Sequence, residues 1–189
     1  MHRMVLQSLL LLLSFICIVH SQNCKWLQPK QEYLNTKILQ AFSQMNCPKE
    51  FNKDCQDYPT AQYNLESIYN ITQVEDVTLA VREVLNGTIR FYMKHHESME
   101  CKQQAWERFQ HLLYYQIYQL EDCVPETAEN DVLKKEISEQ FREMDKYVAE
   151  QEEASCAWDF SHDEIRRNLH LVLQLSSRLR RQHLLQKTV

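Results

Sequence analysis

The chain has 189 residues and a formal net charge of −5, with 26 acidic side chains against 21 lysines and arginines. This acidic balance excludes a general nucleic-acid-binding protein, which would need a basic surface. A single glycine and four prolines exclude glycine-rich phosphate loops and disfavour sheets with tight hairpins, so we expect an all-α protein.

The N-terminus has the pattern of a secretory signal peptide. Arg3 supplies a positive start, a leucine-rich apolar run follows, and Ser21 is a small residue at a typical cleavage position. The run is shorter than the roughly 20 apolar residues of a membrane-spanning helix. We therefore expect residues 1–21 to be removed and residues 22–189 to form one secreted, extracellular domain that is not inserted in a membrane.

Cysteine use also fits an extracellular protein. Cys17 leaves with the signal peptide, and an even number of cysteines remains, which favours three disulfides in any of 15 pairings. A zinc site would need closely spaced pairs such as C-x-x-C, and the sequence has none. The remaining cysteines are Cys24, Cys47, Cys55, Cys101, Cys123 and Cys156.

Apolar residues recur at helical spacing in five segments. The predicted helices cover about residues 32–45, 73–95, 101–123, 130–149 and 156–184. The link from Cys47 to about Tyr69 is long and polar, whereas the link between the second and third helices is short. A long link is typical of an overhand crossover, so the first two helices should be parallel and the second and third antiparallel.

Catalytic and metal-binding patterns are weak. Ser161, His162 and Asp163 are the residue types of a catalytic triad, but neighbours on a helix point in different directions. His95 and His96 lack the i, i+4 spacing of a helical metal pair. Because all mature cysteines are expected in disulfides, no thiol nucleophile remains. We therefore expect neither an enzyme nor a metal or cofactor site.

The last predicted helix differs in charge from the rest of the chain. From Ser161 to the C-terminus there are two acidic and six basic residues, whereas from Glu126 to Glu153 there are ten acidic and four basic residues. A disulfide-stapled helical bundle with an electrically distinct helix is typical of a secreted ligand for a receptor.

Two acceptor sequences predict N-glycosylation, one at Asn70 (N-I-T) and one at Asn86 (N-G-T). A glycan on Asn86 would require that this face of the second helix is exposed to solvent.

Several motifs resemble vertebrate type I interferons. The stretch C-A-W-D at residues 156–159, followed by E-I-R-R at 164–167, resembles the start of the family's last helix. L-E-D-C-V at 120–124 resembles the family's L-E-x-C-V, and the A-W at 105–106 resembles its helix-opening tryptophan. C-K-W at 24–26 is similar to the C-x-W of fish-type members. The resemblance covers essentially the whole mature chain.

The resemblance implies an up-up-down-down helical cytokine bundle with five main helices. Such a ligand bridges the two chains of a heterodimeric cell-surface receptor and thereby activates Janus kinases, STAT factors and antiviral genes. The ligand itself is expected to be monomeric. Another secreted helical cytokine with different receptors is the nearest alternative. A lipid-binding or hydrolytic disulfide-rich protein would need an apolar cavity or a paired His/Asp calcium-type site, which the sequence does not show.

Six mature cysteines exceed the two or four that are usual in the family. The pair Cys24–Cys123 would match the family's first bridge, and the family's second bridge ties the first link to Cys156. Cys55 lies farther along this link than Cys47. The expected pairs are Cys24–Cys123, Cys55–Cys156 and Cys47–Cys101; the alternative exchanges Cys47 and Cys55.

The resemblance also implies where the receptor binds. In the family, the first link and the last helix together form the surface for the high-affinity receptor chain. The expected contacts are His162, Arg166 and Arg167 on the helix, with Lys49 and Lys53 on the link. Basic contacts would face an acidic receptor surface, although each residue could equally be a solvated charge. The second receptor chain is expected on the opposite face, on the second, third and fourth helices.

Overall fold

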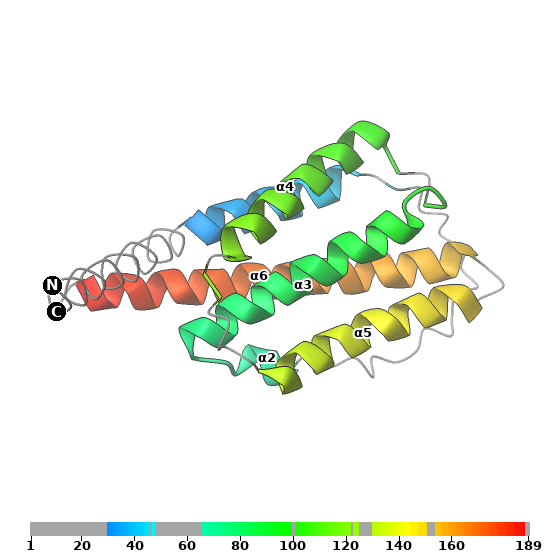
Figure 1. Ribbon diagram of the computed structural model, residues 1–189. Helices are drawn as coiled ribbons and strands as arrows, with labels where there is room; N and C mark the ends of the chain where they lie inside the picture. The colour runs from blue at the N-terminus through cyan, green and yellow to red at the C-terminus, as the bar shows by residue number, and fades with distance from the viewer. Residues whose placement is uncertain are drawn as a thin grey trace, which may run out of the picture.

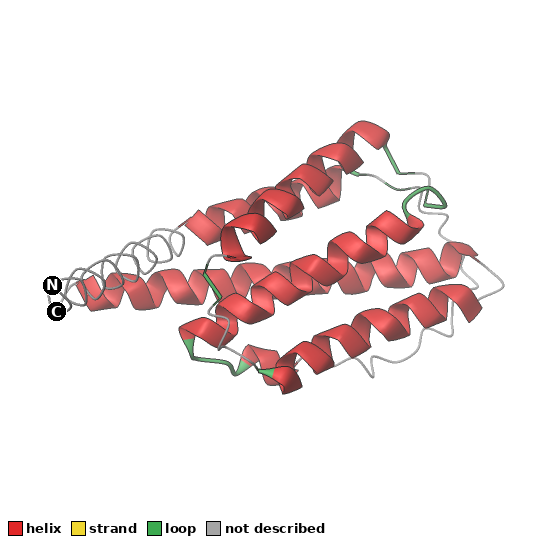
Figure 2. Ribbon diagram, viewed as in Figure 1, coloured by secondary structure: helices red, strands yellow, loops and turns green. Residues whose placement is uncertain are grey.

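The computed structural model describes residues 30–45, 47, 66–99, 101–121, 123–124, 130–150 and 154–187. Figures 1 and 2 show that this part of the chain is a bundle of helices joined by turns, without strands, which confirms the predicted all-α class. None of its helices combines the length and the apolar character needed to cross a membrane. The helices are the N-terminal helix (residues 30–44), α2 (Glu66–Tyr69), α3 (Val74–His95), α4 (Gln103–Glu121), α5 (Asp131–Glu150) and α6 (Ala154–Lys187).

Helix α2 was not predicted, because its four residues lie in the segment that we interpreted as an irregular link. A helix this short has too few residues to show apolar periodicity. It is held in place by Ile68, whose side chain is completely buried in the core. The expectation of an irregular link up to Tyr69 is therefore wrong for these last residues.

The N-terminal helix and α6 are antiparallel neighbours. Glu32, near the start of the first helix, accepts a hydrogen bond from Arg180, near the end of α6, at 2.7 Å. Phe42, near the end of the first helix, stacks on His162 near the start of α6, with ring centroids 4.3 Å apart. These two contacts fix both the direction and the register of the pair.

Helix α3 packs against both α6 and α5. The guanidinium of Arg178 on α6 donates to the carbonyl of Ile71, just before α3, at 2.8 Å. The other end of α3 is tied to α5 by a contact of 2.7 Å between His95 and Asp145. Since Ile71 precedes α3 and Arg178 lies late in α6, these two helices are antiparallel, whereas α3 and α5 are parallel.

Helix α4 begins beside the end of the N-terminal helix. The amide of Lys102 donates to the carbonyl of Met45 at 3.0 Å, and Cys47 forms a disulfide with Cys101. The N-terminal helix and α3 therefore run in one direction and α4 and α6 in the other. This is the up-up-down-down arrangement that we predicted, with α5 as the fifth helix (Figure 1).

Aromatic rings fill the core at the end of the bundle where α3 finishes. Phe42, Tyr92, Trp106 and Phe109 are almost completely buried. Tyr92 stacks on Trp106 at 5.6 Å between centroids, and its ring meets that of Phe109 edge-on. Buried aromatic rings contribute large apolar areas and favour tilted or edge-on pairs. This cluster joins three helices of the bundle and fixes the start of α6 through His162.

Candidate functional site

Three of the predicted receptor contacts lie near the start of α6, and the structure places them differently. The apolar stripe of this helix, which includes Ile165 and Leu169, is buried against the bundle. His162 is half-buried, Arg166 is half-buried, and Arg167 is exposed. Only the two arginines therefore present their charged groups to solvent.

His162 belongs to the aromatic core rather than to the open surface. Its Nδ1 is hydrogen-bonded to the hydroxyl of Tyr92 at 2.9 Å, and its ring stacks on Phe42. Burial raises the pKa of Tyr92 well above its ordinary value, so this hydroxyl stays protonated and needs a partner. His162 therefore has a structural role as the partner of a buried phenol, and its role as a receptor contact stays a prediction.

The two arginines pair with acidic residues on their own helix. Arg166 lies 3.3 Å from Asp163, with 42% of its side chain exposed. Arg167, with 64% of its side chain exposed, pairs with Glu164, whose side chain is only 4% exposed. These are i, i+3 pairs, which lie on the same side of a helix. The local charge is therefore close to balanced.

Other arginines of α6 hold the bundle together. Arg178 donates to the carbonyl of Ile71, and Arg180 pairs with Glu32 at 2.7 Å. The sequence analysis interpreted α6 as a basic surface. The structure adds that four of these arginines, Arg166, Arg167, Arg178 and Arg180, have partners within the protein.

A shallow groove of about 500 Å³ separates the N-terminal helix from α6. Arg166 and His170 form its α6 side, one helical turn apart, and Phe42 lies among the residues of the other side. His170 was missed by the sequence analysis, although its i, i+4 spacing from Arg166 indicates a shared face. The groove residues on the N-terminal helix are Thr36, Leu39, Gln40, Phe42 and Ser43.

Disulfides tie the start of α6 and the end of α4 to other parts of the chain. Cys156 is buried, and both Cys156 and Cys123 are disulfide-bonded. Cys24 and Cys55, the partners that we expect for them, lie outside the described residues, as do Lys49 and Lys53. Cys47–Cys101 is present as expected.

The residue types of a catalytic triad do not come together in this region. His162 bonds to Tyr92, Asp163 pairs with Arg166, and the hydroxyl of Ser161 is buried. Within the described ranges, no three His, Cys, Asp or Glu side chains gather in a way that could hold a metal ion.

The comparison with protein families decides what this bundle is. A family model described as Interferon alpha/beta domain matches residues 27–179, from before the N-terminal helix to late in α6. The chain belongs to the interferon alpha/beta family. Members of this family are cytokines and not enzymes, in agreement with the expected function class.

Human interferon alphas are similar to this interferon along most of their length. Interferon alpha-10 is 27% identical to it, interferon alpha-17 is 26% identical and interferon alpha-4 is 25% identical. Each similarity covers 78% of this chain and 82% of the human protein.

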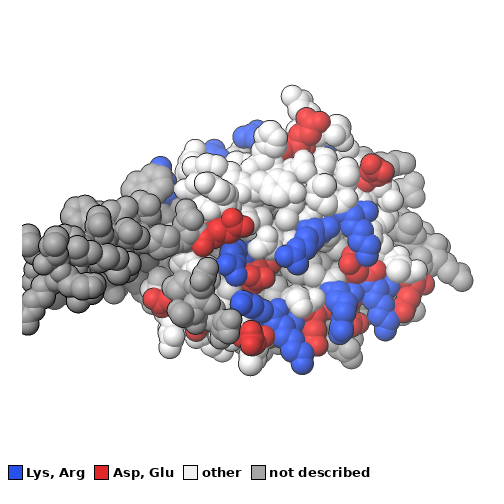
Figure 3. Space-filling model, in the orientation of Figure 1, with Lys and Arg blue, Asp and Glu red and all other residues white. Residues whose placement is uncertain are grey.

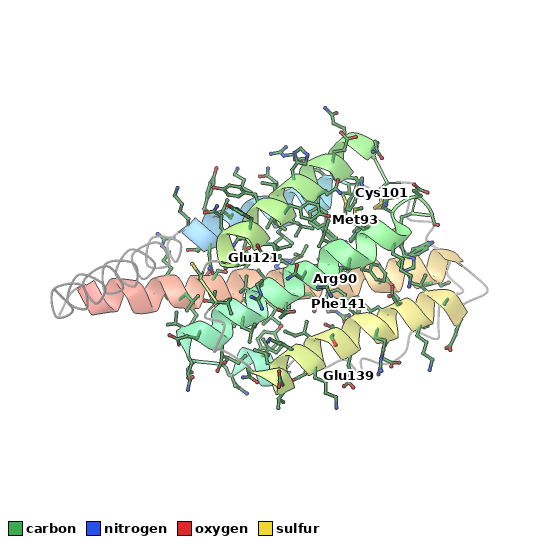
Figure 4. All side chains as sticks on the ribbon, viewed as in Figure 1. Arg90, Met93, Cys101, Glu121, Glu139 and Phe141 are labelled. Carbon is green, nitrogen blue, oxygen red and sulfur yellow. A yellow bond between two sulfur atoms is a disulfide. The ribbon has the colours of Figure 1, made fainter. Side chains whose placement is uncertain are left out.

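The opposite side of this interferon has a second depression, of about 300 Å³, between α3 and α5. Arg90 and Phe141 line it and are labelled in Figure 4. Lys94, at its edge, pairs with Asp145 at 3.1 Å. Figure 3 shows that lysines and arginines alternate with acidic side chains on this side of the molecule, so the surface is mixed in charge.

The two predicted glycosylation positions have different surroundings. Asn70 is exposed in the turn after α2. Asn86 is half-buried and lines the depression between α3 and α5, and Thr88 of its acceptor sequence is completely buried. A glycan on Asn86 would therefore lie over that depression.

Proposed function

We propose that this chain is a secreted type I interferon, close to the fish-type members, that bridges two different receptor chains at the cell surface. Bridging would activate Janus kinases and STAT factors and so induce antiviral genes. Membership of the interferon alpha/beta family supports this proposal most strongly. The C-K-W motif at residues 24–26 is the basis for the fish-type relationship.

The high-affinity receptor chain would bind the groove between the N-terminal helix and α6. This surface combines an apolar floor at Phe42 and Leu39 with hydrogen-bond donors at Arg166 and His170, and the exposed Arg167 is the neighbour of Arg166 on α6. Apolar centres rimmed by arginine are typical of protein interfaces. Lys49 and Lys53 would extend the surface along the first link.

A bridge between Cys55 and Cys156 would hold that link against α6. The two segments would then form one preformed surface, which reduces the ordering cost on binding. Peptide mapping by mass spectrometry tests this pair together with Cys24–Cys123. A peptide that joins Cys47 to Cys156 would overturn the pairing. The same maps report glycan occupancy at Asn70 and Asn86, which we expect at both positions.

The charge reversal Arg166→Glu with Arg167→Glu tests the surface. We expect binding to the isolated high-affinity receptor chain to weaken at least about tenfold. Two basic side chains would become acidic and would repel the acidic receptor surface that we expect opposite them. Arg142→Glu is the control, since Arg142 on α5 is about as exposed as Arg167 and does not line the groove. Arg166→Gln with Arg167→Gln serves as a second variant, because a new carboxylate beside the buried Glu164 could disturb folding.

Unchanged receptor binding by variants with a normal circular dichroism spectrum would exclude these arginines from the interface. The wider proposal is tested with the purified mature protein on fish or amphibian cells. We expect STAT phosphorylation and antiviral gene expression, both lost when the receptor chains are deleted. The second receptor chain would contact the side formed by α3, α4 and α5.

A further inference from the structure

The depression between α3 and α5 has an apolar floor and polar residues around it. Ile137 and Phe141 line it and are only 1% and 8% exposed, so their side chains form the floor. Asn86 and Arg90 on α3 and Ser138 on α5 also line it. Its volume of about 300 Å³ is at the lower end of the range for pockets that bind small molecules.

Most of the charged residues that line this depression are already paired. Lys94 and Asp145 pair with each other, whereas Arg142 and Glu83 each pair with the neighbouring residue in the chain. Arg90 is exposed, and within the described part of the chain its guanidinium has no hydrogen bond or ion pair. The depression therefore offers hydrogen-bond donors that are free to bind a ligand.

Asn86 can carry a covalent ligand at this position. It is the acceptor of the N-G-T sequence, and its side-chain amide makes no hydrogen bond within the described ranges. In secreted proteins the glycan is transferred to the chain before it folds, so the burial of Thr88 in the folded protein does not prevent the transfer. The first sugar, N-acetylglucosamine, is bonded directly to the amide nitrogen and must therefore lie at the depression.

The chemistry of this sugar matches that of the depression. Its hydroxyl and acetamido oxygens accept hydrogen bonds from arginine and serine, and its ring and methyl carbons are apolar. Arg90 lies four residues after Asn86 and therefore on the same side of α3, and Ser138 lies across the depression on α5. Because the sugar is tethered to the protein, weak contacts are sufficient to hold it in place.

We propose that the first sugar of an N-glycan on Asn86 packs into the depression between α3 and α5, over Ile137 and Phe141 and within hydrogen-bonding reach of Arg90. The glycan then joins the two helices on their outer side and stabilises the folded protein. Asn70 does not line this depression and is exposed in the turn after α2, so a glycan there has no such role.

A covered depression also has a consequence for signalling, which rests on the proposed function. The second receptor chain is expected on the side formed by α3, α4 and α5, so the glycan would limit its contact with the depression. The isolated second receptor chain should then bind the unglycosylated protein more tightly, whereas the high-affinity chain should bind both forms equally. Equal binding of both forms by the second chain would refute this regulatory role.

Thermal unfolding of the mature protein tests the position of the glycan without any receptor. Asn70→Gln leaves Asn86 as the single acceptor, and the protein is produced in vertebrate cells that build high-mannose glycans. We expect a melting temperature about 2–4 °C above that of the same chain produced with glycosylation blocked by tunicamycin. Trimming with endoglycosidase H leaves only the first sugar and should preserve the gain, because that sugar makes the contacts.

Arg90→Ala distinguishes a sugar packed in the depression from one that projects into solvent. The substitution should lower the melting temperature of the glycoprotein by at least about 2 °C more than that of the unglycosylated chain. Comparing the two forms cancels the effect of the substitution on α3 itself. Arg108→Ala is the matched control and should affect both forms equally, since Arg108 is an exposed arginine on α4 and does not line the depression.

Four results would each overturn the proposal. They are an unmodified Asn86 in the mass spectrum, a glycan that leaves the melting temperature unchanged, a gain that is lost on trimming, and an Arg90→Ala effect of equal size in both forms. No receptor takes part in these measurements, so failure of the proposed function would leave their results unchanged.

Discussion

The ring of Phe141 on α5 occupies the space that a side chain at Gly87 on α3 would need. A β-carbon built on residue 87 would lie 2.1 Å from Cε2 of Phe141, far inside van der Waals contact. The only glycine of the chain therefore lies where α3 packs closely against α5. Glycine disfavours a helix by about 1 kcal/mol relative to alanine, and close packing on the buried Phe141 offsets this cost.

Gly87→Ala should destabilise the protein even though alanine favours helices. We expect the free energy of unfolding to fall by about 1–3 kcal/mol, because the added methyl group displaces Phe141 and separates α3 from α5. Urea denaturation followed by circular dichroism measures this loss. In a Phe141→Leu background the same substitution should be neutral or stabilising. A parent chain stabilised by Gly87→Ala would contradict the close approach.

Two buried glutamines should respond in opposite ways to replacement by leucine. Gln116 on α4 is completely buried, and its side chain makes no hydrogen bond within the described residues. Gln140 on α5 exchanges hydrogen bonds of 3.2 and 3.1 Å with Asn168 on α6. A buried amide without a partner costs stability, whereas removal of one partner from a pair leaves the other unsatisfied.

Gln116→Leu should therefore raise the melting temperature, by about 2–4 °C for a gain near 1 kcal/mol in a chain of this size. Gln140→Leu should lower the free energy of unfolding by about 1–3 kcal/mol. Calorimetry of the two variants provides the comparison. A loss of stability in Gln116→Leu equal to that in Gln140→Leu would show that Gln116 has a partner in solution.

The carboxyl groups of Glu164 and Glu32 should affect the stability of the folded protein with opposite dependences on pH. Burial raises the pKa of Glu164, against the opposing charge of Arg167. A carboxyl whose folded pKa exceeds its unfolded value stabilises the protein at low pH, and this contribution is lost as the pH rises through the folded pKa. The hydrogen bond from Arg180 lowers the pKa of Glu32, so its contribution is present at neutral pH and is lost as the pH falls.

Unfolding by urea from pH 3 to pH 7.5 should separate the two carboxyls. Glu164→Gln should be more stable than the parent at about pH 7, and this gain should shrink as the pH falls through the raised folded pKa and vanish below the ordinary glutamate pKa of 4.5. Glu32→Gln should be slightly less stable at neutral pH, by less than about 1 kcal/mol because the pair is partly exposed. Parallel stability curves for parent and variants would refute both assignments.

His162→Ala should weaken the fold rather than only the receptor contact. The substitution removes the ring stacked on Phe42 and leaves the buried hydroxyl of Tyr92 without its partner. We expect a loss of about 2–4 kcal/mol in the free energy of unfolding. Arg167, five residues further along α6, is exposed, and Arg167→Ala should change the free energy of unfolding by less than about 0.5 kcal/mol. If the two variants were equally stable, His162 would have no role in holding the fold together.

The sequence by itself determined the fold class, the main helices and the family. Scarcity of glycine, apolar residues at helical spacing and the C-A-W motif are local features, and each can be recognised without knowing which helices touch. Helix α2 was not predicted, because a single helical turn is too short to show a repeat of apolar residues. The direction of the helices also followed from the sequence, since link length limits which ends can meet.

The tertiary structure decided which polar residues face solvent and which have partners inside the bundle. His162, Arg178 and Arg180 look alike in sequence, as polar residues of a basic helix. Their partners, Tyr92, Ile71 and Glu32, lie 70 to 148 positions away in the chain. A charge or an imidazole is neutralised or hydrogen-bonded by what lies across from it, and only the packing of distant helices brings those groups together.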